Sequence, residues 1–168
     1  DKHIGSRISA VLDKLPLKRR QRLQIYHSTE TEGYVAYSAK NKKMSLLYSD
    51  EDTIETELAG KEWDLFTVNR ILQIHLDGKG GLHQHGEVVQ WAPIGLLHML
   101  NAGGAIQKIL PSFTNSLRFE VMGDGELGVF VSKLPEKVHV DNNLVPFQNE
   151  KIYSADNCSG YLLKFHVA

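Results

Sequence analysis

The chain has 168 residues, of which 42% are hydrophobic and 23% are charged, with a net charge of −1 and a pI near 6.8. These values fit one folded domain with a sizeable core, and they exclude a disordered chain or a protein drawn to nucleic acid by its overall charge. No apolar run approaches the roughly 20 residues of a membrane-spanning helix, so we expect no membrane as a partner. The nearly neutral net charge likewise leads us to expect no nucleic acid as a partner.

The start of the chain and its cysteine content indicate where the protein is found. The sequence begins at Asp1 rather than at a methionine and shows no signal-peptide pattern, so we expect a chain trimmed or excised from something longer. Cys158 is the single cysteine and cannot form an internal disulfide, which favours a reducing compartment. We therefore expect a cytoplasmic protein.

The first 30 residues are the least regular part of the sequence. Within residues 6–22, apolar side chains recur with helical spacing, and Pro16 limits such a helix to fewer than three turns. An irregular approach to the first strand explains the same segment. We predict that residues 1–30 are a linker or short helical approach and that residues 31–168 are a separate domain.

From Leu23 onward, short apolar runs alternate with turn residues, as is typical of all-β chains. In Leu117–Val121 the apolar residues fall on one face and both charges on the other, as in a half-buried strand. Turn signals about every 8–12 residues, without long helices between them, favour an antiparallel β-sandwich over a parallel α/β sheet. The predicted strands are Tyr34–Ser38, Met44–Tyr48, Thr53–Leu58, Trp63–Leu72, Val88–Trp91, Gly95–Leu100, Ala105–Leu110, Ser116–Met122, Leu127–Ser132, Lys137–Val140 and Tyr161–Val167.

The run Gln90–Ile106, QWAPIGLLHMLNAGGAI, carries the most specific signal in the chain. It resembles the C-terminal region of the raffinose synthase, stachyose synthase and alkaline α-galactosidase (seed imbibition protein) group of glycoside hydrolase family 36. That group has a phenylalanine-led A-P-I-G-L run followed by M-N-S-G-G-A-I. Here Trp91 takes the aromatic place and Ala102 takes the place of the serine.

Shorter matches lie on both sides of this run, in the same order as in the family. Upstream, Glu62–Val68 (EWDLFTV) resembles an E-Y-x-x-F-T-V strand, and downstream Val121–Ser132 is similar to V-x-G-x-G-x-F-G-x-Y-S-S. Leu134 stands where the family usually has arginine before proline, and residues 1–30 match only loosely. The resemblance extends from residue 34 to residue 145.

The resemblance implies two domains with different roles, one catalytic and one accessory. In such enzymes a (β/α)₈ barrel carries two catalytic aspartates for a retaining double displacement, and a β-sandwich follows the barrel. The present sequence has no strand–helix alternation, so it contains the sandwich and lacks the barrel. Trp63–Phe66 (WDLF) is superficially similar to a W-D-M-F motif of these barrels. Its neighbours place it in a sandwich strand, so Asp64 is no catalytic candidate and we assign no catalytic residue.

Two interpretations follow from this resemblance and from the aromatic residues. The first is an accessory domain that packs on and stabilises a catalytic barrel of the same polypeptide, an α-galactosidase or galactosyltransferase of raffinose metabolism. The alternative is a free-standing carbohydrate-binding module, in which Trp63 and Trp91 stack on galactosyl oligosaccharides. Aromatic residues of a sandwich are more often core or cross-strand pairs, and Trp91 is the strongest core candidate among them.

A third alternative is a cupin-like metal-binding protein. His83 and His85 would face the same side of a strand, and imidazole together with the Glu87 carboxylate is a common ligand set. Glu87 comes closer to the histidines than the corresponding residue of a cupin, however, and the cluster follows a glycine-rich turn at Gly78–Gly81. We therefore predict no bound metal and no cofactor, with these three residues as weak candidates.

Overall fold

The computed structural model describes residues 9–12, 19–24, 33–49, 51–76, 87–110, 116–154 and 157–168. In this part of the chain every strand pairing is antiparallel, and a short 3₁₀-helix joins two strands, which confirms the predicted all-β antiparallel sandwich. Within the same residues, no helix has the length and apolar character needed to span a membrane. The elements are β1 (Ser9–Leu12), β2 (Arg19–Gln24), β3 (Tyr34–Ser38), β4 (Met44–Leu47), β5 (Thr53–Leu58), β6 (Phe66–Arg70), β7 (Leu72–His75), β8 (Val88–Leu96), η1 (Ala102–Ala105), β9 (Ile106–Leu110), β10 (Arg118–Val121), β11 (Gly125–Val131), β12 (Val138–Val140), β13 (Asn143–Val145), β14 (Gln148–Ser154) and β15 (Asn157–Val167).

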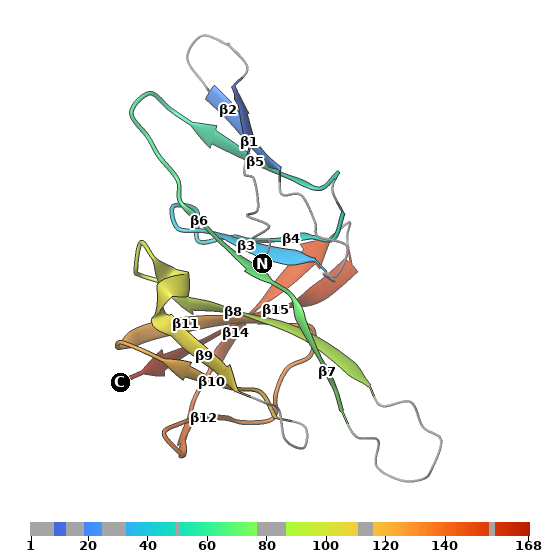
Figure 1. The fold of residues 1–168 in the computed structure, drawn as a ribbon, viewed down its shortest axis with the longest axis vertical. Helices are drawn as coiled ribbons and strands as arrows, with labels where there is room; N and C mark the ends of the chain where they lie inside the picture. The colour runs from blue at the N-terminus through green and yellow to red at the C-terminus, as the bar shows by residue number, and fades with distance from the viewer. Residues whose placement is uncertain are drawn as a thin grey trace, which may run out of the picture.

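A five-stranded sheet with the order β14-β15-β11-β8-β7 lies in the middle of the domain (Figure 1). Its central strand β11 is buried over its last five residues, because other layers cover both faces of the sheet. Side chains alternate between the faces, so Phe130 enters one apolar cluster while Val129 and Val131 enter another. The two clusters form the core on the two sides of this sheet.

The three-stranded sheet β4-β3-β6 covers the first face of the central sheet. Val35 and Tyr37 of β3 belong to the same buried cluster as Phe130, so these side chains hold the two sheets together. The opposite face of β3 is also covered, because Ala36 packs in a cluster with Ile54 of β5. Strand β5 itself belongs to a further sheet with the order β1-β2-β5.

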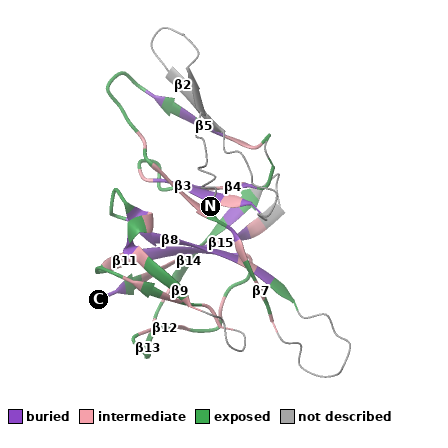
Figure 2. Cartoon of the chain, in the orientation of Figure 1, coloured by how far each residue is buried: buried purple, intermediate pink, exposed green. Residues whose placement is uncertain are grey.

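The β9–β10 and β12–β13 hairpins contribute to the cluster on the second face of the central sheet. Trp91 of β8 stacks on Phe119 of β10, with ring centroids 5.9 Å apart and planes inclined by 23°. Figure 2 shows buried residues along β3 and β8, whereas much of β9 is exposed. The hairpins therefore act as a thin cover whose inner side chains complete the core.

The N-terminal helix predicted for residues 6–22 is wrong, because β1 and β2 form a hairpin there and β2 pairs with β5 from Arg19↔Leu58 to Gln24↔Thr53. A helix shorter than three turns is marginal by itself, and β5 offers an edge whose backbone groups need partners. Pairing with a neighbouring strand thus overrides the weak helical spacing. The domain boundary after residue 30 stays a prediction.

A second correction concerns the strand predicted for Gly95–Leu100. Strand β8 instead continues through Pro93 to Leu96, and the chain then turns toward η1. Pro93 lies past the end of β7 and next to a register shift in the pairing with β11, which is where a strand tolerates proline. Strand β14 is absent from the prediction because its sequence, QNEKIYS, is largely polar.

Candidate functional site

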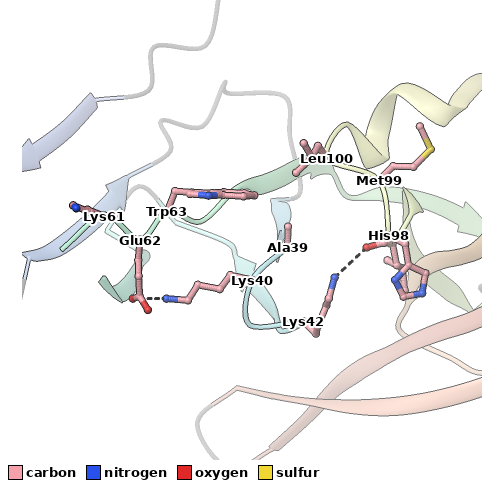
Figure 3. Close-up of a pocket in the computed structure, with 10 residues that line it drawn as sticks. Ala39, Lys40, Lys42, Lys61, Glu62, Trp63, His98, Met99 and Leu100 are labelled. Carbon is pink, nitrogen blue, oxygen red and sulfur yellow. Dashed lines mark hydrogen bonds and ion pairs between the residues drawn. The ribbon is translucent and has the colours of Figure 1, made fainter. Parts of the chain in front are cut away.

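A groove of about 480 Å³ lies where three connections of the fold meet (Figure 3). These connections are the β3–β4 turn, the loop between β5 and β6, and the turn between β8 and η1. Loops gathered on a rigid β-scaffold are common places for binding residues. The side chains that line the groove belong to Ala39, Lys40, Lys42, Lys61, Glu62, Trp63, Leu97, His98, Met99 and Leu100.

Asp64 ties the β5–β6 loop to the β3–β4 turn. Its carboxylate accepts hydrogen bonds from the Ser38 hydroxyl at 2.7 Å, the Lys40 backbone N–H at 3.0 Å and the Asn41 side-chain amide at 3.2 Å. The Ser38 hydroxyl oxygen in turn accepts a bond from the Asn41 backbone N–H at 2.9 Å. Both carboxylate oxygens thus bind groups of the neighbouring turn, so this geometry gives Asp64 a structural role.

Positive charge predominates on the lining of the groove, which includes three lysines and one glutamate among the described residues. Lys40 donates to the Glu62 carboxylate at 2.7 Å, and the Ala59 backbone N–H donates to it at 2.8 Å. The hydrogen bond from Lys40, followed by that from Ala59, lowers the pKa of Glu62 below its ordinary value. Glu62 is therefore an ionised partner of Lys40, whereas a general acid in a glycosidase needs a raised pKa.

Three large apolar side chains of the groove are open to solvent. Trp63 is 62% exposed, Leu100 is 64% exposed and Met99 is 49% exposed. In Figure 3 the indole of Trp63 points toward Leu100. The groove thus combines an exposed aromatic ring with aliphatic side chains and a cationic rim.

Trp91, the second sugar-binding candidate from the sequence, lies in the core instead. It is 2% exposed and packs against Phe119, as expected of a core anchor. No open ring face is left on Trp91 for a sugar to stack on, so the proposed aromatic platform depends on Trp63. Sugar binding at Trp63 stays a prediction.

The metal-ligand candidates His83 and His85 lie outside the described residues. Glu87 directly precedes β8, and its carboxylate forms an ion pair with Lys133. In the part of the chain that the structure describes, no group of three or more His, Cys, Asp or Glu side chains is arranged to hold a metal ion. The expected absence of a metal stays a prediction, which elemental analysis of untagged protein tests. One equivalent of zinc, manganese or iron, lost on substituting both histidines by alanine, would contradict it.

Sequence reasoning did not foresee the groove as a unit. Met99 and Leu100 were expected inside a strand, and the lysines carried no motif. The turns themselves left a signal, since Asn41-Lys42 and Gly60-Lys61 are turn-forming pairs. Both lysines of these pairs have positive φ, 55° for Lys42 and 69° for Lys61, which is uncommon for residues other than glycine.

A family model described as raffinose synthase or seed imbibition protein Sip1 matches residues 7–156. The chain belongs to this family. It is 34% identical over 118 residues to the galactinol–sucrose galactosyltransferase of Pisum sativum, covering 70% of this chain and 13% of that protein. It is 32% identical over 119 residues to Probable galactinol–sucrose galactosyltransferase 5 of Arabidopsis thaliana, covering 71% and 14%. Stachyose synthase of Pisum sativum is 24% identical over 128 residues, covering 76% and 14%.

These comparisons place the chain as a small part of much longer relatives. The matched region makes up 13–14% of the length of each of these three proteins. The family match also includes most of residues 1–30, where the sequence resemblance is loose. The recognised family is thus confirmed, and the chain corresponds to a domain-sized segment of such proteins.

Proposed function

We propose that this domain is a non-catalytic C-terminal β-sandwich of a raffinose-synthase-type galactosyltransferase or α-galactosidase, as found in glycoside hydrolase family 36. There it packs on a catalytic barrel of the same polypeptide and stabilises it. The limited share of each relative that the chain covers supports this role. The single cysteine, which fits a reducing compartment, supports a cytosolic location.

The observation that carries the proposal is the charge arrangement of the groove. A retaining glycosidase needs two carboxyl groups about 5–5.5 Å apart, one of them with a raised pKa. Among the described residues that line the groove, Glu62 is the only acid, and Lys40 holds it in the ionised form. The neighbouring Asp64 is committed to hydrogen bonds with the β3–β4 turn. The described residues of the groove therefore offer no pair of carboxyl groups to act as acid and nucleophile.

The test compares three proteins. They are this chain, the longest polypeptide of its gene, and a version of that polypeptide from which the residues of this chain have been removed. We expect the chain alone to release no galactose from an activated galactoside and to transfer none to sucrose. We also expect the truncated polypeptide to melt at a lower temperature than the complete one. Turnover by the chain that disappears on one Asp or Glu substitution would overturn the proposal, as would an unchanged melting temperature after truncation.

One observation favours a second function, that of a carbohydrate-binding module. Trp63 presents an exposed ring beside polar side chains, the combination that sugar-binding surfaces use, since the apolar face of a pyranose packs on an aromatic ring. The chain has two tryptophans and Trp91 is buried, so an emission change on adding galactosyl sucrose would report on Trp63. A saturable change that is lost in Trp63→Ala would establish the second function.

A further inference from the structure

We propose that the groove is the surface on which the preceding domain of the parent polypeptide docks, and that this domain presents an apolar projection surrounded by carboxylates. This inference rests on the proposed function and specifies the surface through which it works. Trp63 and Leu100 are the apolar centre of the contact, and Lys61 is the cationic edge.

The exposed apolar side chains of the groove lie close together, whereas other exposed apolar side chains of the domain lie apart from it. Trp63, Met99 and Leu100 come from two separate loops and line one concavity. By contrast, Met122 and Tyr153 are 63% and 61% exposed but lie on different strands or turns, outside this groove. Single exposed apolar residues are ordinary, whereas a cluster rich in Trp and Met is typical of an interface.

The charge of the groove indicates the chemistry of its partner. Three lysines line it with one glutamate, which Lys40 already neutralises. Lys42 donates to the Leu97 carbonyl at 3.4 Å, a neutral group that does not offset the positive charge of the lysine. A partner surface with carboxylates around an apolar centre would match both the positive rim and the apolar floor. A neutral sugar would match the tryptophan but would gain nothing from the net charge.

The loops of the groove are already fixed in place, which favours a permanent contact over a mobile binding loop. Asp64 connects the β5–β6 loop to the β3–β4 turn, and Lys42 connects that turn to Leu97. Met99 is held in its own turn by a bond from its N–H to the Leu96 carbonyl at 3.1 Å. A preformed surface loses little conformational entropy on docking.

The length of the relatives indicates what covers the groove, namely another domain of the same polypeptide. The chain matches 13–14% of their length, so most of each relative lies outside the matched segment. A domain of the same polypeptide has a high effective concentration at this surface, so even a modest interface is occupied. A second copy of this chain would bring lysines against lysines and is the weaker fit.

Hydroxyl-radical footprinting tests the docking surface, because tryptophan and methionine are among the side chains most readily oxidised. Trp63 and Met99 are compared between this chain alone and the complete polypeptide, and Met122 serves as the exposed control outside the groove. We expect Trp63 and Met99 to react several-fold more slowly in the complete polypeptide, while the rate at Met122 stays the same.

Other results would overturn the inference in distinguishable ways. Equal rates at Trp63 and Met99 in both proteins would remove the docking role of the groove. Protection of Met122 or Tyr153 instead would leave the accessory role intact but move the interface to another face. Protection of Trp63 in the chain alone on adding a galactosyl oligosaccharide, with none in the complete polypeptide, would replace docking by sugar binding.

A charge reversal provides an independent test. In the complete polypeptide, Lys61→Glu should lower the melting temperature and speed the oxidation of Trp63, because it places a negative charge against the carboxylates of the partner. Lys137→Glu, at an exposed lysine outside the groove, is the matched control and should do neither. Because Lys61 has a φ of 69°, both variants are also made in the chain alone to measure any local cost. A Lys61→Glu polypeptide indistinguishable from the Lys137→Glu control would contradict the charge argument.

Discussion

The two tryptophans of the chain lie in two regions of different character, one in the core and one at the surface. Trp91 lies in β8, where it pairs with Val131 of β11 on one side and Leu72 of β7 on the other, and it is 2% exposed. Trp63 lies in a loop that lines the groove and is 62% exposed. What decides burial is whether another layer covers the position, because a ring is equally hydrophobic in both places.

This contrast separates a segment of the sequence that builds the core from a segment that forms an exposed surface. The motif around Trp91 has the strongest family resemblance, yet its aromatic side chain is a core element of the sheet. The segment around Trp63 resembles the family more weakly, yet it supplies the exposed surface. A strong motif match therefore indicates a structural constraint here, and the candidate site lies beside it.

The largest expected effect is on the buried side of the comparison. Trp91→Ala should destabilise the domain by about 3–5 kcal/mol, because it removes a buried ring and leaves a cavity. That is a large share of a typical domain stability of about 5–15 kcal/mol. Urea denaturation followed by circular dichroism measures it, and loss of soluble expression would agree with it. A Trp91→Ala protein with the midpoint of the parent would refute the core assignment.

A second expected effect tests the end of β8, just before the turn that lines the groove. Gly95 has a φ of +105°, and a Cβ there would lie 1.8 Å from the Ala102 carbonyl oxygen, so Gly95→Ala must displace backbone. We expect a loss of roughly 1–3 kcal/mol in denaturant unfolding. Gly60→Ala is the matched control, since a Cβ at Gly60 meets nothing within 4 Å. Equal midpoints for the two variants would show that the turn adapts freely.

Gly103 and Gly104, the glycine pair of the run Gln90–Ile106, do not carry this backbone strain. Neither of these glycines has positive φ, since both lie in η1. A Cβ at Gly104 would instead meet the Asn101 side chain, with its Nδ2 at 2.4 Å.

A third expected effect is a pH dependence of stability that arises from the buried Tyr37. Burial, followed by the negative charges of Glu126 and Glu150, raises the pKa of Tyr37 above its usual value of 10.0. Its phenol stays neutral in the folded protein while the unfolded chain ionises, so stability is present below pH 10 and falls as the pH rises through the folded pKa. We expect Tyr37→Phe to lose less stability than the parent between pH 9 and 11, measured by urea unfolding at each pH. Parallel losses in the two proteins would argue against this assignment.

Strand positions were predictable where a short apolar run is bounded by turn residues, whether one face of the strand is covered, as in β5, or both faces, as in β3. Tyr34–Ser38 and Thr53–Leu58 agree with β3 and β5 at both ends, and β5 shows the alternation in its burial. Strand β14 was missed because it is largely polar and lies at the edge of the central sheet, where its backbone hydrogen bonds to β15 define it rather than an apolar face.

The groove was harder to predict for a different reason. Its residues come from three connections that are distant in sequence, and only the stacking of the sheets brings Lys40, Trp63 and Leu100 to one place. No local spacing records that arrangement. The exposure of Trp63 was foreseen as one alternative, but the choice between platform and core required the structure.

The smallest expected effect completes the comparison. In the chain alone, Trp63→Ala should change the free energy of unfolding by no more than about 0.5 kcal/mol, because the ring is mostly exposed and no cavity results. Acrylamide quenching provides the second measurement: the parent should show an accessible and a shielded emitter, and Trp63→Ala should retain only the shielded emission of Trp91. The substitution matters only where something covers the groove, so its cost in the complete polypeptide should exceed its cost in the chain alone. A loss of several kcal/mol in the chain alone would mean that Trp63 is already packed within this domain, and the contrast between the two tryptophans would disappear.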